Sequence, residues 1–185
     1  TPMKVVGRVM NAEEAKEEEA KGNFVVKEGE GYRRIVAAPK PVAIVEIDAI
    51  RALADADQPV IAAGGGGIPV MEQGSHLKGA SAVIEKDRAA GLLAKELDAD
   101  VLMFITGVPN VVLNYGSDHP INIDKMTTAE AARYAGEGHF KTGSMLPKVE
   151  SSIDFINAGK GRRAIITSLD GAKSALAGKG GTTIQ

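Results

Sequence analysis

Short apolar runs alternate with amphipathic helical patterns through most of this 185-residue chain, and this alternation constrains the fold most strongly. Residues 100–106 form the most apolar run and predict a buried strand. Residues 87–97 before them place Ala90, Leu93 and Leu97 on one face of a helix. Strands that alternate with helices favour a mainly parallel sheet covered on both faces. The sequence therefore predicts a three-layer α/β/α fold, in which ligands bind at the carboxyl ends of the strands.

The remaining elements are expected from the same periodicities and from glycine and proline breakers. Helices are predicted at residues 44–54, 127–135, 147–158 and 170–177. Strands are predicted at residues 59–63, 82–84, 111–113, 163–167 and 182–184. Elements of this number and length suit one sizeable α/β domain.

The first 38 residues differ from the rest and predict a separate small subdomain. Residues 12–21 are a charged helical pattern rich in glutamate, and two apolar runs flank Gly29 and Gly31, which predicts a hairpin. Few of these residues suit a hydrophobic core. We therefore expect residues 1–38 to form a protruding lid and residues 39–185 to form the main domain, with a proline-rich hinge between them.

Composition and charge exclude several classes of function. The chain has no cysteine, which excludes disulfides, thiolate metal sites and cysteine nucleophiles and fits a cytoplasmic location. The net charge of -2 implies no general affinity for nucleic acid, and no apolar run approaches the ~18 residues of a membrane span. None of the three histidines stands at metal-ligand spacing from another, so no metal ligands are expected. The chain begins at Thr1 rather than at methionine, and we interpret it as a piece of a longer protein.

A small-residue turn leads into a proline and a lysine, Pro147 and Lys148, just where a helix is expected to start. Proline in the first helical turn is tolerated because that amide has no partner within the helix. The unpaired N–H groups and the dipole of such a helix end favour an anion. A lysine held there predicts a phosphate-binding site.

Lys86 is a second lysine at an expected helix start. It lies between an expected strand and helix, with Glu85 before it and Asp87 after it. Asp87 is a plausible N-terminal cap of the helix. A cap does not explain Lys86, because a cation at a helix N-terminus opposes the dipole. Lys86 and Lys148 together predict a clamp on a transferring phosphoryl group. The simpler interpretation, two solvated surface charges, remains open.

A run of four glycines follows the strand expected at residues 59–63; these are Gly64, Gly65, Gly66 and Gly67. Glycines let the backbone approach a ligand and turn its amides toward an anion. A tight exit from the strand is an equally good interpretation. Neither a P-loop nor a dinucleotide-binding glycine fingerprint is present.

The loop after the strand at residues 100–106 is where an adenosine could bind. It begins with Thr106 and Gly107, and the base would lie against Val108 and Met145. The alternative is an ordinary turn into the next strand.

The chain resembles the carbamate kinases of the amino-acid kinase fold, and the resemblance runs in order through essentially all 185 residues. The matching stretches include Gly31-Tyr32-Arg33-Arg34, Gly64-Gly65-Gly66-Gly67-Ile68-Pro69-Val70, Ala82-Val83-Ile84-Glu85-Lys86-Asp87, and Gly143-Ser144-Met145 followed by Pro147-Lys148-Val149-Glu150.

This resemblance implies reversible phosphoryl transfer between ATP and carbamate, giving ADP and carbamoyl phosphate, with Mg²⁺, in arginine or purine breakdown. It implies that Lys86 and Lys148 bind the moving phosphoryl group, that Asp87 orients them and that Lys4 is a third catalytic lysine. It also implies that the four glycines line the carbamate and phosphate site, and that the full-length form is a homodimer. The implied nucleotide-binding residues are Thr106, Gly107, Val108, Val111 and Met145.

Departures from the family pattern leave alternatives open. Glu85 stands where the family usually has aspartate, and Met3 and Val5 differ beside Lys4. Segments of the family's amino-terminal half have no counterpart, so we expect these residues alone to be inactive or nearly so. The alternatives are a non-catalytic nucleotide-binding module and another amino-acid kinase, acting on acetylglutamate or uridylate.

Overall fold

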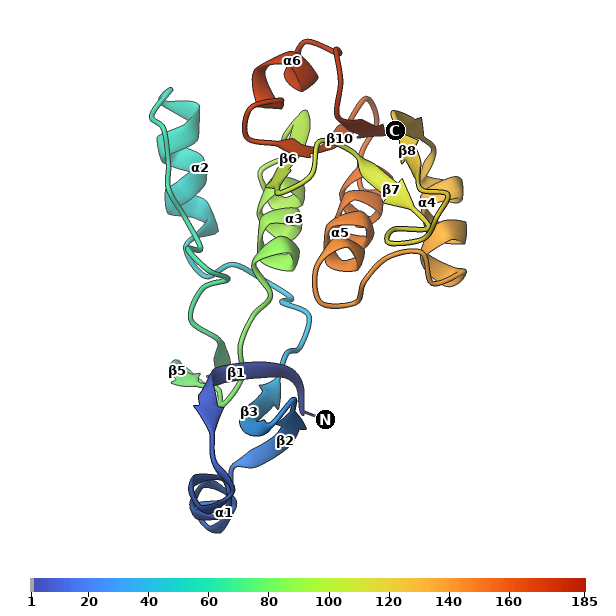
Figure 1. Cartoon of the computed structure of the whole chain (residues 1–185). Coiled ribbons are helices and arrows are strands. Elements are labelled where there is room, and N and C mark those ends of the chain that lie inside the picture. The colour runs from blue at the N-terminus through green and yellow to red at the C-terminus, as the bar shows by residue number, and fades with distance from the viewer. Residues whose placement is uncertain (1) are drawn as a thin grey trace. The chain divides into compact units, whose positions relative to one another are not determined.

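The computed structural model describes residues 2–185, with side chains from Lys4 onward, and the chain divides into two compact units (Figure 1). The first unit comprises the residues up to Lys40 together with Gly65–Glu85, and the second comprises Pro41–Gly64 and Lys86–Gln185. The sequence predicts one boundary, between residues 38 and 39. The chain instead passes between the units after Lys40, after Gly64 and after Glu85. The role of a lid for the first unit stays a prediction.

The second unit is built on a four-stranded sheet in the order β6-β10-β11-β9. Strands β6 (Val101–Thr106) and β10 (Arg163–Ser168) run parallel along their whole length. Strand β11 (Thr182–Ile184) is antiparallel to β10 and parallel to β9 (Lys125–Met126). Two of the three pairings are parallel, so the predicted mainly parallel sheet is confirmed.

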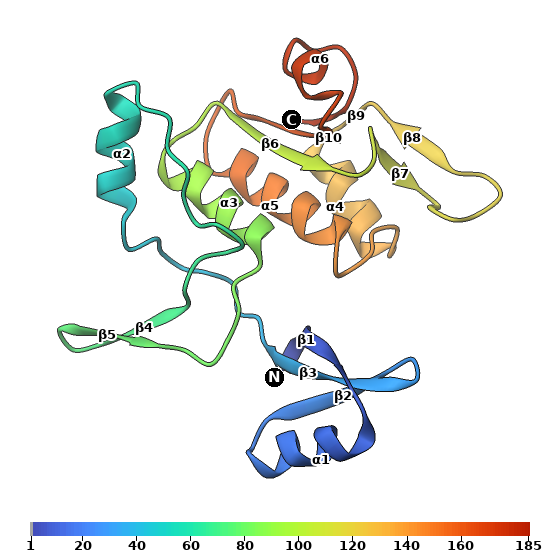
Figure 2. The same ribbon diagram turned by 60° about the vertical axis from the view of Figure 1, so that its left-hand side comes forward.

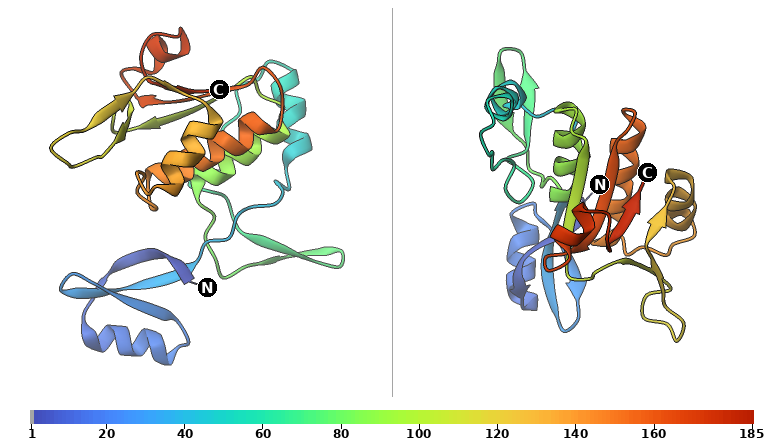
Figure 3. Two further views of the ribbon diagram at one scale, coloured as in Figure 1. Left: turned by 90° about the vertical axis from the view of Figure 1, so that its right-hand side faces the viewer. Right: turned by 90° about the horizontal axis from the view of Figure 1, so that it is seen from above.

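Helices cover both faces of this sheet (Figure 2). Helices α3 (Lys86–Glu96), α4 (Thr128–Gly136) and α5 (Met145–Asn157) lie on one face, and the short α6 (Ala172–Leu176) lies on the other (Figures 2 and 3). The three-layer arrangement is therefore confirmed, with most of the helical layer on one side.

The remaining elements of the second unit are a helix and a hairpin. Helix α2 (Ile47–Asp55) starts three residues later than predicted, and its Arg51 guanidinium donates a hydrogen bond to the carbonyl oxygen of Glu96. Strands β7 (Val111–Leu113) and β8 (Ile121–Ile123) form the antiparallel hairpin. Strand β7 is predicted by the sequence, and β8 is not.

The core lies between the sheet and the helices α3, α4 and α5. Its largest fully buried side chains come from the strands β7, β10 and β11 and from α5. They include Val111, Val149, Phe155, Ile166 and Ile184, none of which has any exposed surface. Burial of aliphatic side chains contributes about 25 cal/mol for each Å² removed from water, which makes this cluster the main stabilising element of the unit.

The first unit contains a three-stranded antiparallel sheet in the order β1-β3-β2. The predicted hairpin is confirmed as β2 (Phe24–Glu28) and β3 (Gly31–Ala37). Strand β1 (Pro2–Met10) is not predicted, because Gly7 interrupts its apolar pattern. At Gly7 the backbone has φ of 75°, and the register with β3 shifts between Val6 and Met10.

Two of the predicted strands are wrong. Residues 59–63 belong to no strand, and the side chain of Ile61 is fully exposed. An apolar run forms a strand only where a neighbour completes its hydrogen bonds, and among the described residues none pairs with this one. Residues 82–84 make a single bridge, between Ala82 and Ala37. The sequence also misses an exposed hairpin formed by β4 (Val70–Gln73) and β5 (His76–Gly79).

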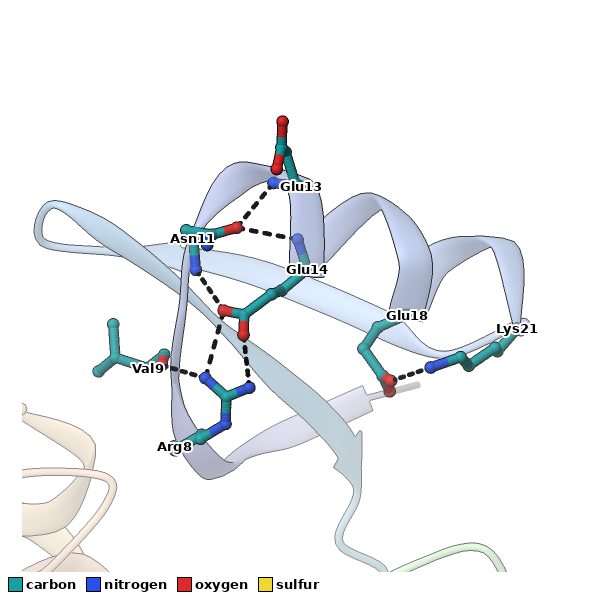
Figure 4. Close-up of polar contacts among 7 residues, drawn as sticks. All are labelled: Arg8, Val9, Asn11, Glu13, Glu14, Glu18 and Lys21. Carbon is teal, nitrogen blue, oxygen red and sulfur yellow. Dashed lines mark hydrogen bonds and ion pairs between the residues drawn. The ribbon is translucent and has the colours of Figure 1, made fainter.

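Helix α1 (Ala12–Ala20) is confirmed, and a capping box fixes its start (Figure 4). The Asn11 side chain accepts hydrogen bonds from the backbone N–H groups of Glu13 and Glu14, both at 2.9 Å. The Glu14 carboxylate in turn accepts from the Asn11 N–H at 2.9 Å and from the Arg8 guanidinium at 2.6 Å. The hydrogen bond from Arg8, followed by the one from Asn11, holds the pKa of Glu14 below its usual range.

Glu14 should make the stability of α1 depend on pH. Because the folded state lowers the pKa of Glu14, its contribution is complete above the unfolded value of about 4.3 and is lost as pH falls through the folded value. Glu14→Gln should therefore reduce amide protection of α1 at pH 7 and flatten its loss as the pH falls below about 4.3, the unfolded value. Hydrogen exchange measures both. Glu19→Gln on the same helix is the control, and equal flattening in this control would contradict the assignment.

Candidate functional site

A buried ion pair joins α3 to α5. The Lys148 ammonium donates a hydrogen bond to the Asp87 carboxylate at 2.7 Å, and these side chains are only 9% and 7% exposed. Two charges are withdrawn from water only at a considerable cost, which their mutual attraction offsets when the geometry is good. The structure therefore brings together two of the predicted catalytic residues, Lys148 and Asp87.

The start of α5 places Lys148. The helix begins at Met145, two residues earlier than predicted, so Pro147 lies inside the first turn, where its missing N–H is not needed. The N–H of Leu146 donates to the carbonyl oxygen of Lys141 at 3.1 Å and closes the preceding turn. The Lys148 nitrogen lies 5.8 Å from the centre of the Phe104 ring, two residues before the carboxyl end of β6. Lys148 therefore lies close to the edge of the sheet where α/β proteins bind ligands.

The helices α3 and α5 approach closely at Gly91. A Cβ atom placed on Gly91 would lie 2.7 Å from the Cβ atom of Ser151, which is too short for a real contact. Gly91 lies one helical turn after Asp87, and Ser151 lies three residues after Lys148. An ion pair between Arg88 and Glu150, at 2.9 Å, joins the same two helices. The absent side chain at Gly91 thus sets the spacing that lets Asp87 and Lys148 meet.

Asp87 is not the N-terminal cap that the sequence suggests. Helix α3 begins at Lys86, so Asp87 lies inside its first turn, and its carboxylate is hydrogen-bonded to Lys148 instead. A carboxylate in the first turn still interacts favourably with the helix dipole. Lys86 is the first residue of α3, and its catalytic role stays a prediction.

A second lysine–carboxylate pair lies in the first unit. The Lys4 ammonium on β1 donates a hydrogen bond to the Glu85 carboxylate at 2.5 Å. Their side chains are 37% and 11% exposed. Sequence reasoning assigned Lys4 to catalysis and did not find this partner, since 81 positions separate the two residues.

The glycine run forms a turn with an unusual backbone. Gly64, Gly66 and Gly67 have φ values of 47°, 138° and 87°, a region that favours glycine, and Gly65 lies between them. The strand exit proposed as an alternative is wrong, because residues 59–63 form no strand. The boundary between the two units falls inside this run, after Gly64. Its phosphate-binding role stays a prediction.

The loop after β6 is fastened at its far end. The Asn110 side-chain amide donates to the carbonyl oxygens of Ile123, at 3.2 Å, and Gly181, at 3.0 Å. The Val111 N–H donates to the Thr182 hydroxyl at 2.7 Å. These contacts hold the loop that carries the predicted nucleotide-binding residues. Sequence reasoning missed Asn110 and Thr182, although an asparagine directly before a buried strand is a usable signal.

The predicted nucleotide-binding residues differ in exposure. Thr106 and Val108 are half-buried, and Gly107 is exposed. Met145 is half-buried and packs against the core, whereas the Val111 side chain lies wholly inside it. A nucleotide could thus meet Val111 only through its backbone, and all of these assignments stay predictions.

Residues 2–185 contain no group of three or more histidine, cysteine or acidic side chains that could hold a metal ion. In the same part of the chain, no helix is both long and apolar enough to cross a membrane.

Comparison with known proteins defines the class of the protein. Residues 7–168 match the model of the amino acid kinase family, and the chain belongs to this family. It is 48% identical over 185 residues to the carbamate kinase-like protein YqeA of Escherichia coli K12, and 46% identical to a carbamate kinase of Clostridium perfringens. Both matches cover 99% of this chain, which spans 59% of the length of each relative.

Solved structures agree with these relatives. The carbamate kinase of Giardia lamblia bound to AMP-PNP is 40% identical and superposes with a TM-score of 0.91, over 99% of this chain and 58% of that one. An N-acetylglutamate synthase of Neisseria gonorrhoeae is 19% identical, with a TM-score of 0.53, and shares the fold alone.

The buried pair predicts non-additive effects on stability. Lys148→Met leaves the Asp87 carboxylate buried without its partner, which should cost about 3 to 5 kcal/mol of unfolding free energy. The double variant Asp87→Asn with Lys148→Met should be clearly more stable than Lys148→Met, because no uncompensated charge remains. Urea unfolding checks both values. Additive losses in the double variant would contradict a direct pair.

Because α3 and α5 approach closely at Gly91, alanine at this position should lower stability, whereas its helix propensity alone would raise it. Alanine normally stabilises a helix interior by about 1 kcal/mol relative to glycine. Gly91→Ala should instead destabilise the protein, because its Cβ meets Ser151. Gly136→Ala, at the last residue of α4, is the control without a close contact, since a Cβ there has no atom within 4 Å. Adding Ser151→Gly should recover the stability lost in Gly91→Ala, and thermal unfolding of the three variants and the unsubstituted protein decides.

Proposed function

We propose that the chain belongs to a carbamate kinase, an enzyme that transfers a phosphoryl group reversibly between ATP and carbamate. The observation that carries this proposal is the buried Lys148–Asp87 pair beside the carboxyl end of β6, in a chain 46% identical to a carbamate kinase. A cation held at this edge of an α/β sheet suits the charge of a phosphoryl group in transit.

The lysines and Asp87 would act on the phosphoryl group through electrostatic interactions. In phosphoryl transfer, negative charge spreads over the three outer oxygens of the moving group, while the attacking and leaving oxygens lie roughly in line. Lys148 and Lys86 would donate hydrogen bonds to these oxygens as the group moves from ATP to a carbamate oxygen and ADP leaves, and a catalytic role of Lys4 is part of the same proposal. Asp87 would hold the Lys148 ammonium in place, so that no reorganisation is needed during transfer.

The loops at the ends of the strands would hold the nucleotide. Residues 106–108 would contact the adenosine, with Met145 on the far side of the base. The left-handed backbone of the glycine run, described above, would turn amides toward the phosphates. The fastening of the first loop by Asn110 and Thr182 supports this assignment, because a bound nucleotide needs a loop of fixed shape.

Magnesium would enter with the nucleotide. Mg²⁺ usually keeps several waters and binds to one or two carboxylates together with substrate phosphates. The part of the chain that the structure describes offers no acidic cluster for it, and the Asp87 carboxylate is already bound to Lys148. We therefore derive no step through the metal ion from these residues.

The length of the relatives bears on activity and assembly. Because the chain spans 59% of its carbamate kinase relatives, we expect full phosphoryl transfer only when the remaining part is also supplied. A homodimer and a cytoplasmic location are part of the same proposal. The same coverage favours a second candidate, a nucleotide-binding module without catalysis, which would bind ADP and form no ATP alone. An acetylglutamate kinase has less support, since the 19% identical N-acetylglutamate synthase is not a kinase by name and shares the fold alone.

The decisive experiment measures ATP formation from ADP and carbamoyl phosphate with the natural gene product. Lys148→Met should lower kcat at least 100-fold, because an interaction made in the transition state is lost, and should leave KM for ADP within about threefold. Lys173→Met on the exposed surface of α6 is the control and should keep full activity. Unfolding must be followed in parallel, since Lys148 is buried.

Three outcomes separate the candidate functions. Turnover with carbamoyl phosphate supports the carbamate kinase. ADP binding by calorimetry without turnover supports the nucleotide-binding module. Turnover with acetylglutamate and none with carbamate would contradict the proposal.

A further inference from the structure

We propose that Glu85 is a positioning residue that holds Lys4 for phosphoryl transfer, so that the two carboxylates flanking Lys86 each hold one lysine. This inference rests on the proposed function for the role of Lys4, whereas the contact itself does not depend on it. Asp87 holds Lys148 in the second unit, and Glu85 holds Lys4 in the first.

The contact has the features of a positioning interaction. The Lys4 nitrogen lies within hydrogen-bond distance of the Glu85 carboxylate, and the opposite charges of the two groups make this a charge-assisted hydrogen bond. The Glu85 side chain is 11% exposed, so its carboxylate is fixed by its surroundings rather than free in solvent. The Lys4 side chain is 37% exposed and keeps access to a ligand. One partner is therefore anchored and the other remains able to act.

The backbone of the first unit brings these two residues together. Ala37, the last residue of β3, lies opposite Pro2 of β1. The same Ala37 forms the bridge to Ala82, and its carbonyl oxygen accepts a hydrogen bond from the Val83 N–H at 2.9 Å. A single residue of β3 thus ties the start of β1 to the segment that leads into Glu85. The Lys4–Glu85 pair completes this connection with side chains.

The chemistry explains why such a residue is useful. A lysine ends in a compact charge on a flexible four-carbon stem and loses rotamer entropy when it is fixed. A carboxylate that holds the ammonium before the substrate arrives removes that loss from the transfer step. Donors arranged in advance stabilise developing charge without reorganisation.

The covalent chain links this arrangement to the other lysine. Glu85 and Asp87 are two residues apart, so their Cα atoms lie within about 7 Å of each other in any conformation. Lys86 stands between them. The segment Glu85–Asp87 therefore connects a carboxylate that holds Lys4, a lysine, and a carboxylate that holds Lys148.

The contact can be tested without any enzyme activity. A carbodiimide adds to a carboxylate, and a lysine amine in contact with this activated ester then forms an amide while the carbodiimide leaves as its urea. The natural gene product should yield a crosslinked peptide pair joining Lys4 to Glu85, identified by mass spectrometry. Glu85→Asp should lower this yield severalfold, because its side chain is one methylene shorter. Glu28→Gln, which removes the partner of Arg33 in the same unit, should leave the yield unchanged.

Steady-state kinetics of the same variants test whether Glu85 positions Lys4. Glu85→Gln should lower kcat about tenfold or more while KM for ADP stays within about twofold, and Glu85→Asp should retain part of the lost activity. A loss caused by unfolding would lower the melting temperature and the fraction of folded enzyme, so kcat is calculated per folded protein, and Glu28→Gln reports the effect of breaking an ion pair elsewhere in the unit.

The outcomes distinguish this inference from the proposed function. Absence of the Lys4–Glu85 crosslink, or unchanged kcat in Glu85→Gln, overturns the inference and leaves the carbamate kinase assignment intact. Absence of turnover in the unsubstituted protein overturns the proposed function, and the crosslink yields then decide whether Glu85 holds Lys4.

Discussion

The buried ion pair between Lys148 and Asp87 is the interaction on which the arrangement of the second unit depends. A charge removed from water is tolerated only with its partner at hydrogen-bond distance, so α3 and α5 must keep one fixed spacing. Gly91 makes that spacing possible, and the ion pair between Arg88 and Glu150 reinforces it on the surface. The same ion pair thus fixes both the spacing of α3 and α5 and the position of the Lys148 ammonium.

Local patterns account for most of the fold. The helix α5 could be predicted because its apolar residues repeat with a helical period, and β6 because its apolar run is bounded by breakers. The strand expected at residues 59–63 fails because apolar residues do not supply a pairing partner, and Ile61 is left exposed. Strand β1 was missed for the opposite reason: its pairing with β3 compensates for Gly7, which a local pattern cannot reveal.

In the candidate site, too, some residues could be predicted from the sequence and some contacts could not. Lys148 and Lys86 could be selected from the sequence, because a cation at the start of a helix is anomalous and asks for an explanation. Asp87 could be selected with them, but the contacts of Lys4 and Gly91 could not. Glu85 meets Lys4 across 81 positions, and Gly91 meets Ser151 across the gap between two helices. Such contacts follow from the tertiary arrangement, and a single sequence holds no periodic signal for them.

The position of β6 at the end of the sheet order has a consequence for the behaviour of the protein in solution. Among residues 2–185, β6 pairs only with β10, so its other edge presents unpaired backbone N–H and C=O groups. Ile105 on this strand is half exposed, and no proline or lysine interrupts the edge. A strand of this kind is a template for any extended segment that meets it. Concentrated samples of these residues alone should therefore self-associate or aggregate through β6 unless another strand covers it.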